Sequence, residues 1–206
     1  MYILAHRGYW LYKEEENTLD AFQRAYENGF GIETDVRDYN EQLVISHNIP
    51  AAGCTAFSDF ADQYAKEGKS LPLALNVKAD GMQKILKNIL QLYEIDHYFM
   101  FDMSIPEQVV YIHDGFHTFS RQSEYEREIV MYGQTEGVWM DEFKTAWITE
   151  EIIANHLANG KRIGIISSEI HNQDSDRLWN IIAPFQNSEK LLLCTDEPMK
   201  ARNFFK

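Results

Sequence analysis

The segment Ile32-Glu33-Thr34-Asp35-Val36 is a short apolar run that carries two carboxylates at alternate positions. Side chains at alternate positions of a β-strand lie on the same face, so Glu33 and Asp35 are expected side by side. Two negative charges at this spacing repel each other unless a cation lies between them or one of them is protonated. Ile32 and Val36 indicate a buried strand, where the paired acids need a partner. Oxygen ligands of this kind favour Mg²⁺ or Ca²⁺ over zinc.

Short apolar runs alternate with longer amphipathic stretches along the whole chain. We interpret eight runs as strands, at residues 2–5, 32–36, 73–77, 98–103, 118–120, 137–140, 162–167 and 191–195. We interpret six stretches as helices, at residues 18–28, 82–93, 105–112, 149–158, 174–185 and 197–205. This alternation predicts a parallel sheet, which is either a closed (β/α)₈ barrel or a doubly wound open sheet.

Nearly every predicted strand ends in polar or charged side chains, and this recurrence favours the barrel. These strand-end residues are His6, Arg7, Glu33, Asp35, Asn76, Lys78, Asp102, Arg121, Asp141, Glu169, Thr195 and Asp196. In a (β/α)₈ barrel the carboxyl ends of the strands converge on one face, where the active site is built. The chain contains no Pro- or Ser-rich linker. We therefore predict an α/β protein with a compact (β/α)₈ TIM barrel as a single domain over residues 1–206.

The chain is acidic and has few cysteines. Its 206 residues include 19 Lys and Arg against 32 Asp and Glu, a net charge of −13. This charge excludes nucleic-acid binding by bulk phosphate neutralisation and adhesion to an anionic membrane surface. Two cysteines make no disulfide framework, and no run approaches the ~20 apolar residues of a membrane helix. The N-terminal residues turn polar at once, so we expect a cytoplasmic protein without a nucleic-acid partner or stable membrane association.

Two histidines follow apolar runs and lie near residues that bind anions. His6 directly follows the first predicted strand, and His47 follows the apolar residues 43–46. One imidazole can accept a proton from an attacking hydroxyl group while another protonates the leaving oxygen. Arg7 can hold a phosphate through two hydrogen bonds, and Lys78 adds a second positive charge. Together with the paired acids, these residues predict a site for metal-assisted phosphoryl chemistry.

Four motifs in the first quarter of the chain occur in an order that characterises one enzyme family. The motifs are His6-Arg7-Gly8, Glu16-Asn17-Thr18, Glu33-Thr34-Asp35-Val36 and His47. This ordered set resembles the glycerophosphodiester phosphodiesterases and their phosphatidylinositol-phospholipase-like relatives. Two later segments extend the resemblance: Asn76-Val77-Lys78, where the family has Glu-x-Lys, and Thr195-Asp196-Glu197-Pro198, which is similar to its last-strand Thr-Asp-x-Pro. The resemblance implies a (β/α)₈ barrel.

The resemblance implies hydrolysis of a small phosphodiester in lipid metabolism, with one divalent cation, Mg²⁺ or Ca²⁺, as cofactor. It implies the following roles: His6 and His47 as the acid–base pair, Glu33 and Asp35 as metal ligands with Asn76 in the third ligand position, and Arg7 and Lys78 as phosphate contacts. Arg121 and Glu169 are further candidates for substrate contact because of their positions at strand ends.

Three departures from the family pattern indicate a divergent, short member. Asn76 stands where the family has a carboxylate ligand, and Asn48 replaces the Asp that usually follows the second histidine. Residues 49–68 form a shorter segment than the usual insertion and lack its Arg-containing motif. Two other functions remain open: a barrel that binds a phosphorylated ligand without turnover, and a barrel enzyme of unrelated chemistry such as a sugar-phosphate isomerase. Both histidines favour the phosphodiesterase, Asn76 favours the binder, and the ordered motifs oppose the isomerase.

Overall fold

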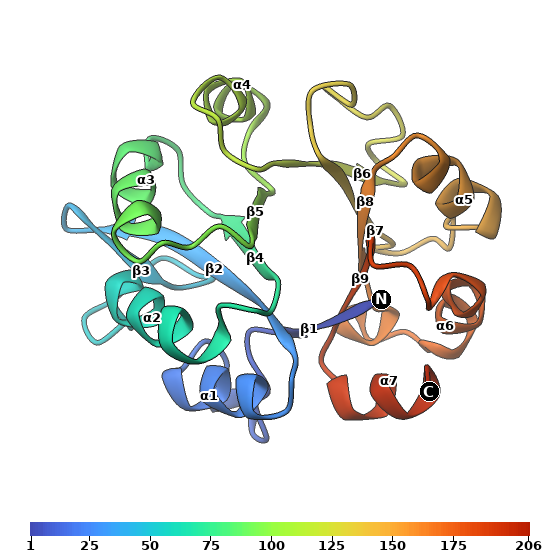
Figure 1. The fold of residues 1–206 in the computed structure, drawn as a ribbon, viewed down its shortest axis with the longest axis horizontal. Helices are drawn as coiled ribbons and strands as arrows, with labels where there is room; N and C mark the ends of the chain where they lie inside the picture. Colours follow the sequence, from blue (N-terminus) through green and yellow to red (C-terminus); the bar gives the residue numbers. More distant parts are fainter.

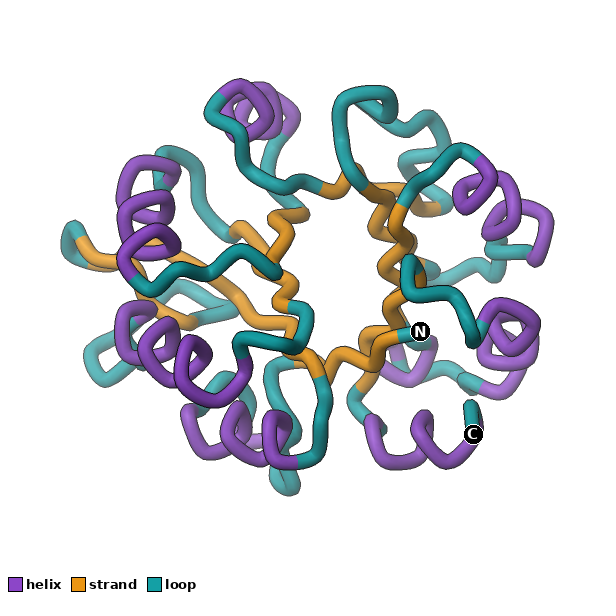
Figure 2. The backbone as a smooth tube through the Cα atoms, viewed as in Figure 1, coloured by secondary structure: helices purple, strands orange, loops and turns teal.

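Residues 1–206 are all described by a computed structural model, in which an inner ring of strands is surrounded by helices (Figures 1 and 2). The strands are β1 (Tyr2–His6), β2 (Gly31–Tyr39), β3 (Gln42–Ile45), β4 (Leu73–Val77), β5 (Tyr98–Phe101), β6 (Phe119–Ser123), β7 (Gly137–Asp141), β8 (Arg162–Ile166) and β9 (Leu191–Thr195). The α-helices are α1 (Leu19–Glu27), α2 (Phe57–Gln63), α3 (Gln83–Leu92), α4 (Ile105–His113), α5 (Glu150–Ala158), α6 (Asp176–Ile182) and α7 (Pro198–Phe204). None of these helices has the length and apolar character needed to cross a membrane.

The strands form a parallel barrel that is closed almost completely. Hydrogen-bonded neighbours follow the order β5-β4-β2-β1-β9-β8-β7-β6, and β3 pairs with β2 in antiparallel fashion outside this ring. A single parallel bridge, Met100 to Thr118, joins β5 to β6 and completes the circle. The predicted (β/α)₈ barrel is confirmed, and the doubly wound open sheet is excluded because its two outer strands would not meet.

The helices cover the barrel with apolar faces, as α1 illustrates. Thr18 precedes this helix and accepts a hydrogen bond from the Ala21 N–H at 3.3 Å, so it acts as the N-cap. Phe22, Ala25 and Tyr26 recur at helical spacing and are buried. The helix ends where Gly29 takes a left-handed backbone conformation (φ +71°), which glycine adopts without strain.

The barrel interior is filled by one cluster of strand side chains. It consists of Leu4, Ala74, Phe99, Phe101, Phe119, Trp139, Ile166, Leu192 and Cys194. Phe99 stacks on Phe119 across the β5–β6 junction, with ring centroids 3.8 Å apart, and Phe101 lies 3.9 Å from Trp139. Gly164 faces Trp139 so closely that a Cβ there would lie 2.3 Å from the indole ring. Large aromatics on one side of the interior are therefore accommodated by small residues on neighbouring strands.

Most of the predicted elements agree with the structure, and three differ. The strands at 73–77 and 191–195 have the predicted bounds. Residues 42–45 form β3, a hairpin partner of β2 that was not among the eight predicted strands. Helix α2 was not predicted, and the helix expected at 174–185 ends at Ile182 and continues as a 3₁₀ turn (η4, Ala183–Phe185) that contains Pro184. Proline lacks the N–H that would continue an α-helix.

Candidate active site

A cavity of about 350 Å³ opens where the strands of the barrel end. Eighteen residues line it: His6, Arg7, Lys13, Glu16, Glu33, Asp35, His47, Asn76, Lys78, Phe101, Asp102, Trp139, Asp141, Phe143, Ile166, Ile170, His171 and Asp196. They include seven of the nine residues that the sequence predicts for the site. The structure therefore brings both predicted histidines, all three predicted metal ligands and both predicted phosphate contacts to one cavity.

A sharp turn after β1 places Arg7 at the cavity. Arg7 has a left-handed backbone (φ 56°), and Gly8 follows with φ 87°. A Cβ at Gly8 would lie 2.9 Å from the backbone of Ala21, so only glycine fits this close approach to α1. The Arg7 N–H donates to the Glu33 carbonyl oxygen at 2.9 Å, which ties the turn to β2. A left-handed non-glycine residue costs conformational energy and is often found at functional sites.

The buried carboxylate of Asp35 lies between two positive side chains. Its oxygens are 3.3 Å from Arg7 Nε and 3.4 Å from Lys78 Nζ, and only 1% of its side chain is exposed. Asn17 Nδ2 donates to the same carboxylate at 2.9 Å. Arg7 in turn donates through Nη1 to Glu16 at 2.8 Å. The predicted phosphate contacts Arg7 and Lys78 thus lie next to Asp35, one of the predicted metal ligands. Both form ion pairs with its carboxylate.

Two other oxygens of the predicted metal ligands are buried without a hydrogen-bond partner. They are Oε2 of Glu33 and Oδ1 of Asn76. Glu33 is 2% exposed, and burial together with the charge of Asp35 raises the pKa of its carboxyl group. A buried oxygen without a donor is destabilising, and a cation is one partner that would satisfy it. Asn76 also donates through Nδ2 to Asp102 at 3.1 Å, which aims its remaining oxygen away from that carboxylate.

This donor set fits a divalent cation that prefers oxygen ligands. It consists of two carboxylates, Glu33 and Asp35, and the amide oxygen of Asn76 on the neighbouring strand, where Asn76 pairs in register with Asp35. No group of three or more His, Cys, Asp or Glu side chains is arranged to hold a metal ion. The fit rests on the two unpartnered oxygens and on the chemistry of these three residues.

His6 is held in place by a carboxylate from the last strand. Its Nδ1 lies 2.7 Å from Asp196 Oδ1, and its Nε2 lies 3.8 Å from Glu33 Oε2. Burial lowers the pKa of His6, but the hydrogen bond that His6 donates to Asp196 and the nearby negative charges outweigh burial, so the pKa is raised. The Asp196 carboxylate fixes the orientation of the His6 ring. Nε2 is therefore directed toward Glu33, which lines the same cavity.

His47 has a different environment. It follows β3, its side chain is exposed, and its Nδ1 lies 3.2 Å from the side-chain oxygen of its neighbour Asn48. It reaches the cavity from the hairpin outside the barrel ring. No carboxylate orients this imidazole.

No protein-family model and no curated protein matches the sequence. Several solved structures, however, have the same barrel architecture as this chain. A glycerophosphodiester phosphodiesterase from Parabacteroides distasonis superimposes with a TM-score of 0.72 over 99% of this chain and 96% of its own, at 13% identity. The glycerophosphodiester phosphodiesterase from Agrobacterium tumefaciens gives 0.70 over 100% and 98%, also at 13% identity. The chain has the fold of the glycerophosphodiester phosphodiesterases.

A more distant neighbour shares the same barrel. It is a Ca²⁺-dependent phosphatidylinositol-specific phospholipase C from Streptomyces antibioticus, with a TM-score of 0.55, 8% identity, and coverage of 100% of this chain and 96% of its own. The glycerophosphodiester phosphodiesterase fold that the motifs imply is thus confirmed over nearly the full length of the chain.

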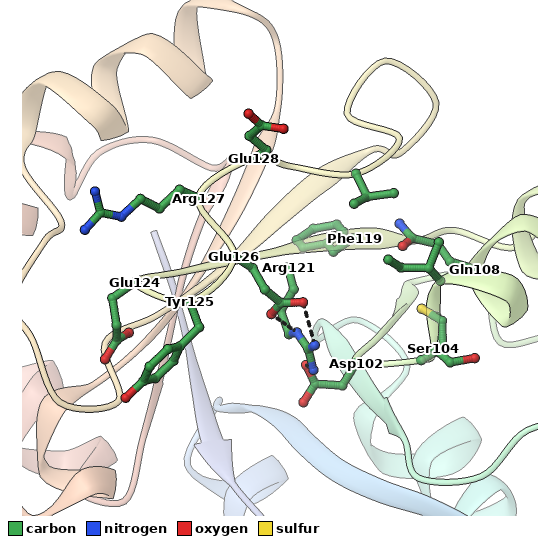
Figure 3. A pocket seen from close by; sticks show the side chains of 13 residues that line it. Asp102, Ser104, Gln108, Phe119, Arg121, Glu124, Tyr125, Glu126, Arg127 and Glu128 are labelled. Carbon is green, nitrogen blue, oxygen red and sulfur yellow. Dashed lines mark hydrogen bonds and ion pairs between the residues drawn. The ribbon is translucent and has the colours of Figure 1, made fainter.

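Arg121 and Glu169, the other two predicted site residues, do not line the cavity at the ends of the barrel strands. Arg121 lies in an adjacent cavity of about 660 Å³, where it donates to both carboxylate oxygens of Glu126, at 2.5 and 2.7 Å (Figure 3). Its Nη1 lies 3.4 Å from Asp102, a residue that lines both cavities. Glu169 accepts hydrogen bonds from Ser167, from Thr195 Oγ1 and from the Asp196 N–H, which join the ends of β8 and β9. Their roles as substrate contacts stay predictions.

Several residues in the cavity had no role in the sequence analysis. Asp196 and Asp141 line the cavity and were noted only as strand ends. Asn17, which donates to Asp35 beside the cavity, was noted only as part of a motif. Each of these residues lies at a strand end or in a motif. Such a position predicts the face of the barrel on which a residue lies, but not the side chain with which it pairs. The partner of Asp196 lies 190 positions away in the chain.

Proposed function

We propose that this protein is a phosphoric diester hydrolase that hydrolyses a small glycerophosphodiester with the help of one divalent cation, Mg²⁺ or Ca²⁺. The observation that carries this proposal is the meeting of seven predicted residues in one cavity, which opens at the carboxyl ends of the barrel strands. The shared fold with glycerophosphodiester phosphodiesterases supports it. A role in glycerophosphodiester turnover in the cytoplasm is part of the same proposal.

The phosphate of the substrate would bind between Arg7 and Lys78. Both cations line the cavity and lie within 3.4 Å of Asp35, so their charge is concentrated at one place. In a chain with a net charge of −13, this local positive pair gives an anionic substrate a favourable position. Guanidinium and ammonium groups form strong charge-assisted hydrogen bonds with phosphate oxygens.

Glu33, Asp35 and Asn76 would hold the cation. When bound, the cation neutralises phosphate charge and polarises the phosphoryl group for attack. The unpartnered oxygens of Glu33 and Asn76 support this assignment. The Streptomyces neighbour is described as Ca²⁺-dependent, which supports a cation of this class.

His6 would remove the proton from the attacking water. Its Nδ1 is held by Asp196, so in the neutral imidazole Nε2 is the nitrogen free to accept that proton. Attack on phosphorus then expels an alcohol, whose oxygen needs a proton as the bond breaks. The cavity offers two further imidazoles for this second transfer, His47 and His171.

The direct test is an assay of the purified chain with glycerophosphodiesters, after treatment with EDTA and after addition of Mg²⁺ or Ca²⁺. We expect release of an alcohol and a phosphomonoester that depends on the added cation. Tight binding of the diester without turnover would instead support the phosphate-binding barrel, which the neutral Asn76 favours. Turnover that is unaffected by EDTA would contradict the cation site.

Replacement of Asn76 with aspartate is expected to tighten cation binding at least ~10-fold, which corresponds to ~1.4 kcal/mol. The added charge would lie beside the buried carboxylates of Glu33 and Asp35, where position 76 now offers a cation only an amide oxygen. Calorimetric titration with Mg²⁺ and Ca²⁺ measures the change. Asn159→Asp, an equal charge change on an exposed residue at the end of α5, is the control. Equal affinities for both variants would place Asn76 outside the cation's coordination.

A further inference from the structure

His171 forms a second histidine–carboxylate pair in the same cavity. It ends the short turn η3 (Ser168–His171) after β8, and its Nε2 lies 2.7 Å from Oδ1 of Asp141 at the end of β7. Both residues line the cavity with His6. The pair has the same 2.7 Å separation as His6 and Asp196, but the opposite ring nitrogen faces the carboxylate.

The two pairs leave one free nitrogen on each imidazole. Asp196 occupies Nδ1 of His6, and Asp141 occupies Nε2 of His171, so Nε2 of the first and Nδ1 of the second are available. A carboxylate partner orients an imidazole and stabilises its protonated form during proton transfer. His47 is exposed and lacks such a partner. His171 is therefore better prepared for proton transfer than His47.

The cavity has a charged side and an apolar side. The charged side chains of Arg7, Asp35 and Lys78 come from or directly follow β1, β2 and β4, which are neighbours in the barrel. The apolar lining residues come from β5, β7, β8 and the loops after β7 and β8; they are Phe101, Trp139, Phe143, Ile166 and Ile170. His171 lies on this apolar side, with its ring centroid 5.1 Å from that of Phe143. An organic alcohol is better accommodated there than among the charged groups.

We propose that His171, held by Asp141, is the catalytic acid that protonates the leaving alcohol; this rests on the proposed phosphodiesterase function. His6 Nε2 takes a proton from water as the water oxygen forms its bond to phosphorus. The bond between phosphorus and the alcohol oxygen breaks, and its electron pair stays on that oxygen. The oxygen then receives the Nδ1 proton of His171. The products are a phosphomonoester and an alcohol, and proton exchange with solvent restores both histidines.

The charges around His171 agree with a protonated resting state. The hydrogen bond that His171 donates to Asp141 raises the pKa of His171, burial lowers this pKa, and the charge of Asp141 raises it further. Among the more distant groups, His6 lowers the pKa and Glu124 raises it, and the net pKa lies above the usual value. A general acid needs its proton at the start of the reaction.

The test uses two glycerol phosphodiesters that differ in the second alcohol, ethanol or 4-nitrophenol. Ethoxide is a poor leaving group that needs a proton, whereas 4-nitrophenolate departs as an anion. We expect His171→Gln to lower kcat for the ethyl diester by roughly 10²–10⁴-fold and to change kcat for the nitrophenyl diester by less than ~10-fold. Asp141→Asn is expected to shift the high-pH limb of the ethyl diester profile to lower pH, because it removes the carboxylate that stabilises the imidazolium.

The control is His113→Ala, which removes an exposed histidine beside Asp114 on α4 and should leave both activities unchanged. His47→Ala is measured in parallel. The proposal is overturned if His171→Gln loses activity on both diesters alike or loses none. If His47→Ala instead loses activity only on the ethyl diester, the catalytic acid is His47. If the wild-type protein hydrolyses neither diester, the proposed function itself fails, independently of His171.

Discussion

Replacement of His6 with alanine is expected to lower kcat by roughly 10²–10⁴-fold, the usual contribution of a positioned acid–base group. The variant removes the only imidazole that contacts both Asp196 and Glu33, at 2.7 and 3.8 Å. Water would then lose its proton acceptor, and Asp196 would lose its partner. Steady-state kinetics with a glycerophosphodiester and saturating cation measures the loss.

The fold should survive this substitution, because His6 is the last residue of β1 and lies at the cavity rather than in the apolar interior. An unchanged circular dichroism spectrum and melting temperature would show that the loss is catalytic. The leaving group gives a second criterion. A base that acts on water is needed for both the ethyl and the nitrophenyl diester, so His6→Ala should impair both, and unchanged turnover would remove His6 from the mechanism.

Replacement of Trp139 with alanine is expected to destabilise the protein by about 3–5 kcal/mol, as large-to-small substitutions in cores do. Trp139 is 1% exposed, and its ring lies 3.9 Å from Phe101 and 5.8 Å from Phe99. Gly164 offers no side chain to fill the space that the indole leaves. Denaturant unfolding followed by fluorescence or circular dichroism measures the loss.

Tyr12→Ala is the matched control, because this aromatic residue is 70% exposed. Its free energy of unfolding should stay within about 0.5 kcal/mol of the wild type. A loss below ~1 kcal/mol in Trp139→Ala would mean that the aromatic interior contributes little to the barrel.

The sequence predicted the barrel because its evidence was local and repeated. Each of the eight strands gave an apolar run, and residues 73–77 and 191–195 were found at their predicted bounds. Helix α2 had the same kind of signal, with Phe57, Phe60 and Ala61 at helical spacing, but it is only seven residues long and no side chain caps its start. A short pattern without start or stop signals gives little local evidence for a helix.

The cavity was predictable where its residues lie close in sequence. His6, Arg7, Glu33 and Asp35 belong to motifs in the first quarter of the chain. The pairs His6–Asp196 and His171–Asp141 connect residues 190 and 30 positions apart, so they depend on how the barrel closes. A strand-end position alone also failed to separate cavity residues from Glu169, whose carboxylate is turned toward Thr195. Neighbouring residues at a strand end point in alternate directions, and no composition rule tells which one faces inward.

The single bridge between β5 and β6 has a consequence for association between molecules. If this junction opens, β5 and β6 become free edges of an eight-stranded sheet, and free edges are where sheets recruit other chains into aggregates. The stacked rings of Phe99 and Phe119 span the junction, and the Arg162 guanidinium lies 5.6 and 5.5 Å from their centroids. These three side chains close the part of the barrel that backbone hydrogen bonds leave almost unpaired. They therefore protect the protein against edge-to-edge aggregation, and the two phenylalanines also fill the barrel interior.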